Sequence, residues 1–241
     1  EPFVYKPRWD AASLLYVKPL AGWSNYPTPR CANFGDSAAI YRATADNLLH
    51  IAVRAKESHP KMAGLARWLF DKLYTPLQQN TPDDLGAFGL VNGYHFLTLV
   101  LLPQAAEPLS PEEAGLDLLE TFSAGNAIAR NDWSGRTVLA TRTGGEPLHA
   151  MAHLHGDFNS FILTHNNERM LADTGHSCYR NLIHELEAST LTHNTCSFTV
   201  VCEDQTDPMH GASLNQGKDY WRHFDTDGKP QPPLDTGARL L

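Results

Sequence analysis

The chain has 241 residues, of which 42% are hydrophobic and 19% charged, a composition that allows one large or two modest domains with a real core. Its formal net charge of −8 argues against a nucleic-acid-binding protein, because such proteins usually carry a basic surface. The longest apolar run, residues 96–102, is too short to cross a membrane. Neither nucleic acid nor a membrane is therefore expected as a partner.

The first half of the sequence has the spacing of helices. After an opening broken by prolines (residues 1–30), Asp36 and Ser37 predict the N-cap of a helix that runs to about Glu57. Pro60 suits the first turn of a second helix, with apolar residues at helical spacing up to Leu73. A third, buried helix is predicted over residues 94–102, and a linker over 104–113.

The second half changes to the short apolar runs and glycine-containing turns of an antiparallel sheet or sandwich. The sequence thus predicts an α+β protein with a helical part at 1–120 and a β part at 121–241. The predicted strands are 126–132, 137–143, 160–164, 170–173 and 195–201.

Four cysteines are present: Cys31, Cys178, Cys196 and Cys202. They form no CxxC metal pair and are too few for a disulfide scaffold. Cys196 and Cys202 are close enough in sequence to form a bridge, but buried free thiols are favoured.

A row of polar residues in HLHGDFNSF is the first sign of chemistry. His153, His155, Asp157 and Asn159 alternate, so on an extended strand their side chains would share one face. Polar side chains in such a row need partners or a solvent-lined groove. This favours a site over ordinary surface histidines.

Two later residues complete a candidate metal centre. Asp173, in LADTG, follows His155 at a distance that suits a neighbouring hairpin strand, and His193, in HNT, begins the next apolar run. Two imidazoles and a carboxylate, with one position left for water, match the preferences of zinc. An alternative is an Fe(II) oxygenase of the cupin type, with His155, Asp157 and His193 as the facial triad.

Tyr26 lies in NYPTPR, four residues before Arg30 and shortly before FGDS. From the residues alone, Tyr26 is interpreted as a packing residue in a proline-rich loop. The motifs NYPTPRCANFGDS, ARNDW, HLHGDFNSF, RMLADTGHSCY and THNT, in this order, resemble those of the heparinase II/III-like polysaccharide lyases, over about residues 16–201. The resemblance implies the end of an (α/α) toroid followed by an antiparallel β-sandwich domain.

The resemblance also implies roles for individual residues. Tyr26 matches the tyrosine that serves as catalytic acid, and in many members as base, and His153 matches a histidine that shares the proton transfers. Arg30 and Tyr179 would contact the sugar. His155, Asp173 and His193 match the ligands of a structural zinc.

The implied reaction is β-elimination from a uronate, in which a base removes the C5 proton and an acid protonates the oxygen that leaves C4. The implied partner is an anionic polysaccharide or oligosaccharide, the implied compartment is the periplasm or the cell exterior, and an oligomer is allowed.

Only 25 residues precede Tyr26, too few for the helix that carries the family's carboxylate-neutralising residue. We therefore expect a fragment or a shortened relative with weak lyase activity on its own. A metal-stabilised domain that binds acidic glycans without cleaving them is the non-enzymatic alternative.

Overall fold

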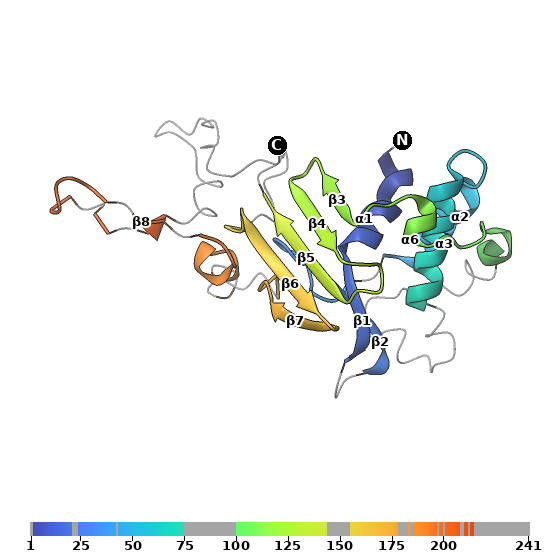
Figure 1. Cartoon of the computed structure of the whole chain (residues 1–241), viewed down its shortest axis with the longest axis horizontal. Coiled ribbons are helices and arrows are strands. Elements are labelled where there is room, and N and C mark those ends of the chain that lie inside the picture. Colours follow the sequence, from blue (N-terminus) through green and yellow to red (C-terminus); the bar gives the residue numbers. More distant parts are fainter. Residues whose placement is uncertain are drawn as a thin grey trace. The chain divides into compact units, whose positions relative to one another are not determined.

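Helices and antiparallel strands follow one another in separate runs in a computed structural model (Figure 1), which confirms the predicted α+β class. None of the described helices is long and apolar enough to cross a membrane. The structure describes residues 2–20, 24–41, 43–74, 100–143, 155–177, 183, 186–196, 198–199, 201–207, 210–211 and 213–214.

The chain divides into two compact units, and each unit is assembled from separate segments. The first unit holds Glu1–Cys31, Ile40–Glu120 and Arg130–Thr137. The second unit holds Ala32–Ala39, Thr121–Ala129 and Val138–Leu241. The assignment of residues 1–120 to a toroid stays a prediction.

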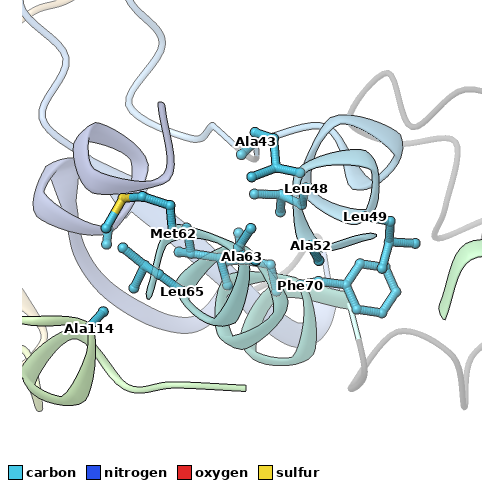
Figure 2. Packing of buried hydrophobic residues seen from close by; sticks show 14 of the residues in the cluster. Ala43, Leu48, Leu49, Ala52, Met62, Ala63, Leu65, Phe70 and Ala114 are labelled. Atoms are coloured by element: carbon cyan, nitrogen blue, oxygen red, sulfur yellow. The ribbon is translucent and has the colours of Figure 1, made fainter. Parts of the chain in front are cut away.

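Helices α2 (Ala45–Arg54) and α3 (Pro60–Tyr74) supply most of the core of the first unit. Proline begins α3 as predicted, because its missing N–H has no helical partner at that position anyway. Helix α2 starts after Thr44, so the predicted N-cap at Asp36 is wrong. Apolar side chains of both helices gather in one cluster (Figure 2), which includes Leu48, Leu49, Ala52, Met62, Ala63, Leu65 and Phe70.

Two shorter helical segments flank this core. Gly64 of α3 approaches Leu109, whose N–H donates to the Gly64 carbonyl at 3.0 Å. Ser110 and Glu113 then form a capping box at the start of α6 (Pro111–Ala114), so the predicted linker at 104–113 is partly helical. Of the predicted helix at 94–102, residues 94–99 lie outside the described residues; residues 100–101 are helical and η3 (Leu102–Gln104) follows.

The opening of the chain is more regular than its prolines indicated. It contains η1 (Pro2–Tyr5), α1 (Lys6–Ser13) and an antiparallel pair, β1 (Leu14–Leu20) and β2 (Ser24–Cys31). In a two-stranded sheet each strand has one edge without a partner strand. The prolines of β2 are therefore tolerated at positions whose backbone N–H would not bond to β1.

The five-stranded sheet follows the chain in the order β3-β4-β5-β6-β7. Residues 166 and 167 have positive φ angles of 49° and 61°, as the tight turn between β6 and β7 requires. The strands are β3 (Leu119–Phe122), β4 (Asn126–Arg130), β5 (Thr137–Arg142), β6 (Ser160–His165) and β7 (Glu168–Leu171).

These strands confirm the predictions at 126–132, 137–143 and 160–164 to within a few residues, whereas β3 was missed. The predicted strand 170–173 is displaced, since β7 ends before Asp173. The predicted strand 195–201 is reduced to β8 (Phe198–Thr199), which pairs with β9 (Ser213–Leu214). Cys31, Cys196 and Cys202 form no disulfide bridge, as favoured, but of these three only Cys31 is buried, and Cys178 lies outside the described residues.

Candidate functional site: a buried histidine and carboxylate cluster

His155 and Asp157 lie two positions apart in the sequence, shortly before β6, and both are buried. They are not on an extended strand, so that prediction is wrong. The Ser160 N–H donates to the Asp157 carbonyl at 3.1 Å, and Asn159 has a positive φ of 59°. The segment therefore turns at this point, and its polar side chains do not form a row on one face.

The imidazole of His155 is paired with Asp36. Its Nε2 lies 2.7 Å from Asp36 Oδ1, and the two side chains are 0% and 6% exposed. Burial lowers the pKa of His155 below its usual value, although the hydrogen bond with Asp36 acts in the opposite direction. His155 is therefore held as a neutral imidazole, the form that ligates metals.

A second imidazole–carboxylate pair joins His193 to Asp173. Nδ1 of His193 lies 2.8 Å from Asp173 Oδ2, and both side chains are fully buried. Burial acts to raise the pKa of Asp173, but hydrogen bonds from His193, Gly175 and Ser160 outweigh it and bring that pKa below its usual value. Asp173 is consequently a buried carboxylate that remains ionised.

The residues after His193 hold it in place, which gives the HNT motif a structural role. The Asn194 side-chain amide donates to the carbonyls of Phe161 and Ala172 at 2.9 and 2.8 Å. The Thr195 hydroxyl donates to the Phe158 carbonyl. Three backbone groups on or beside β6 and β7 thereby fix the segment that carries the imidazole.

Asp157 forms a third buried carboxylate with partners of its own. Its Oδ2 accepts from the Gly35 N–H at 2.8 Å and lies 3.1 Å from Arg142 Nη1. Burial raises the pKa of Asp157, and the attraction to Arg142 opposes this rise. The Arg142 guanidinium comes from the end of β5. Asp157 thus anchors residues 32–39 against the sheet within the second unit.

His176 and Glu187 extend the cluster beyond Asp36. Nδ1 of His176 lies 3.5 Å from Asp36 Oδ1 and 3.4 Å from Glu187 Oε2. Among the described residues, Asp36, His155 and His176 form a group whose ligand atoms all lie within 4.8 Å of one another. This group shares only His155 with the predicted triad.

The donor set fits a divalent metal such as zinc. In the described part of the chain, His193 Nε2 is buried and has no hydrogen-bond partner. A buried polar atom without a partner destabilises the folded state, and a bound metal ion would remove this cost. The ring centroids of His155 and His193 are 5.4 Å apart. Two adjoining imidazoles, each hydrogen-bonded to a carboxylate, are typical of protein sites for zinc.

The remaining predicted site residues fall elsewhere. Tyr26 lies on β2, in the first unit. Arg30 is on the same strand, and its buried guanidinium donates to the Thr28 carbonyl at 2.9 Å. His153 and Tyr179 lie outside the described residues.

Sequence reasoning missed Asp36, His176, Glu187 and Arg142 as members of the cluster. The signal for Asp36 was present, since it is the aspartate of the FGDS motif, but it was interpreted as a helix cap. His176 and Glu187 stand in no spacing pattern that would distinguish them from surface residues.

One comparison with known families bears on this cluster. Residues 117–231 match a family model described as Heparinase II/III-like, C-terminal. The matched range includes His155, Asp173 and His193, and it confirms the resemblance found in the sequence. This part of the chain is therefore similar to the heparinase II/III-like C-terminal family, a similarity that points to the polysaccharide lyases. No curated protein matches the chain.

Proposed function

We propose that the protein acts as a polysaccharide lyase that cleaves uronic-acid-containing glycans by β-elimination. The observation that carries the proposal is the cluster of histidines and carboxylates around His155, most of which lies inside the region that matches the heparinase II/III-like family. A folded domain rarely encloses so many ionisable groups unless they bind an ion or act on a ligand.

The proposed reaction breaks the C4–O bond and forms a C4–C5 double bond, while the C5 proton passes to a base and the leaving oxygen receives a proton. We assign the proton transfers to Tyr26 and His153, following the resemblance. Arg30 and Tyr179 are the proposed contacts to the sugar. A cationic group near the tyrosine would favour its ionised form, which a base at C5 requires.

The proposed metal is zinc, with His155, Asp173 and His193 as its ligands. Its role is structural, because it would fix His155, which follows the proposed catalytic His153 by two positions in the sequence. Zinc supplies a tetrahedral link between segments that are far apart in sequence. An oligomer and a periplasmic or secreted location remain part of the proposal.

The test is an ultraviolet absorbance assay for unsaturated uronate ends, run with heparan sulfate, hyaluronan and alginate. We expect product from at least one substrate, and loss of product in Tyr26→Phe. Tyr5→Phe is the matched control, since Tyr5 is exposed on η1 and has no proposed role. No unsaturated product from any of the three substrates would contradict the proposal.

A further inference from the structure

We propose that Asp36 is the positioning residue of the metal centre. Its carboxylate holds the Nε2–H of His155 and so leaves Nδ1 as the nitrogen that ligates the ion. The inference rests on the metal site of the proposed function and adds a residue to it. It starts from the 2.7 Å contact between two side chains that are 0% and 6% exposed.

The length of this contact indicates a hydrogen bond. Two ligands of one tetrahedral zinc, each about 2.0–2.1 Å from the ion, lie about 3.3 Å apart. The 2.7 Å between His155 Nε2 and Asp36 Oδ1 is shorter and matches a hydrogen bond to a charged acceptor. Asp36 therefore accepts a hydrogen bond from the Nε2–H of His155 and does not share an ion with that nitrogen.

The hydrogen bond decides which nitrogen of His155 can bind metal. A neutral imidazole has one N–H and one lone pair, on different nitrogens. With the proton held on Nε2 by Asp36, the lone pair lies on Nδ1. A carboxylate that fixes the tautomer of a ligating histidine in this way also fixes the ring orientation and increases the basicity of the ligand.

The backbone on both sides of Asp36 is fixed, so the carboxylate is preorganised. The Gly35 N–H donates to Asp157 at 2.8 Å. The carbonyl of Ser37 accepts from the His176 N–H at 3.3 Å. A carboxylate held in this way does not have to be ordered when the ion binds, which favours affinity.

Zinc affinity tests the inference, measured by competition with a chromogenic chelator. We expect Asp36→Asn to bind zinc about ten- to a hundredfold more weakly than the parent chain, still with one ion per chain. Asp36→Glu, which keeps a carboxylate, should recover part of the loss. Asp71→Asn is the matched control, because Asp71 pairs with Arg67 on the surface of α3, and its affinity should be unchanged.

Cobalt(II) substitution separates positioning from direct ligation. If Asp36 acts through His155, the visible cobalt spectrum of Asp36→Asn keeps its band shape, and His176→Gln binds zinc as the parent does. If Asp36 and His176 are themselves ligands, both variants lose the ion and the cobalt bands change. That result would overturn the inference, as would an Asp36→Asn variant with the affinity of the parent.

A measurement on the parent chain covers the case in which Asp36→Asn does not fold. Long-range ¹H–¹⁵N spectra of the zinc-loaded protein should show His155 protonated at Nε2, and a proton at Nδ1 overturns the inference. Failure of the lyase assay is a separate outcome, because it contradicts the proposed function and leaves the zinc results standing. A parent chain that binds no zinc overturns the inference whatever its activity.

Discussion

Nδ1 of His193 lies 2.8 Å from Oδ2 of Asp173, and neither side chain has any exposed surface. The carboxylate is surrounded by donors, since the Gly175 N–H contacts Oδ1 at 2.9 Å and the Ser160 hydroxyl contacts Oδ2 at 3.3 Å. The other nitrogen of the imidazole, Nε2, is buried and has no hydrogen-bond partner among the described residues, so a metal ion could satisfy it.

Zinc should therefore stabilise the folded chain through His193. At a free concentration a hundredfold above its dissociation constant, a ligand that binds only the folded state stabilises it by about 2.7 kcal/mol. We expect zinc to raise the thermal unfolding midpoint of the parent chain and not that of His193→Gln. His59→Gln, which changes an exposed histidine next to α3, should retain the shift. A shift that persists in His193→Gln would contradict the assignment of His193 as a ligand.

Arg142→Gln should destabilise the protein strongly. It removes one partner of a buried ion pair whose side chains are 9% and 0% exposed, and it leaves the Asp157 carboxylate uncompensated. Such changes cost about 3–5 kcal/mol, measured as the free energy of unfolding in denaturant. Arg67→Gln breaks the partly exposed surface pair with Asp71 and should cost at most about 1 kcal/mol. Equal effects of the two substitutions would show that the Arg142 pair is not buried in solution.

Gly64→Ala should destabilise α3 even though alanine is the better helix former. A Cβ at this position would lie 2.5 Å from Leu109 Cγ and 2.9 Å from Leu109 Cβ. The segment that carries Leu109 is tied to α3 by the hydrogen bond to the Gly64 carbonyl, so it cannot withdraw freely. Overpacking of this kind costs about 1–3 kcal/mol. The double variant Gly64→Ala, Leu109→Ala should be less unstable than the sum of the two single variants, and strict additivity would refute the clash.

Glu113 should titrate below its usual range. Hydrogen bonds from the backbone N–H and the side chain of Ser110 lower the pKa of this exposed carboxyl. Because the folded-state pKa is lowered, the contribution to stability is complete above the usual pKa and is lost as the pH falls through the folded value. A carboxyl ¹³C titration should show the low pKa in the parent chain and a return toward the usual value in Ser110→Ala. Ser58→Ala is the control, and an unchanged Glu113 titration in Ser110→Ala would contradict the capping box.

Local sequence patterns predicted the helices and strands whose position depends mainly on residues close together in the sequence. Helix α3 was found because Pro60 starts it and apolar residues follow at helical spacing. Strands β5 and β6 were found because each is a short apolar run bounded by turn residues. Strand β2 was missed because its prolines read as a loop, although a two-stranded sheet tolerates them.

The site was predicted only in part, because its partners come from distant parts of the chain. His155, Asp173 and His193 were singled out, and the structure brings them into one cluster. Asp36, however, is 119 positions from His155, and nothing in the spacing of either residue links the two. The residues around Asp36 predicted a helix cap. In the structure, the Asp36 carboxylate instead contacts His155, and the helix begins later in the chain.

The short segment Ala32–Ala39 determines where the chain can be divided. The change in sequence pattern near residue 120 invites a cut there to isolate the metal-binding half. That cut would remove the hydrogen-bond partner of His155, the backbone donor to Asp157 and the Asn33 amide, which donates to the Asp173 carbonyl at 3.2 Å. Eight residues that come eighty or more positions before strand β3 are thus an integral part of the second unit, and an expression plasmid for that unit has to include them.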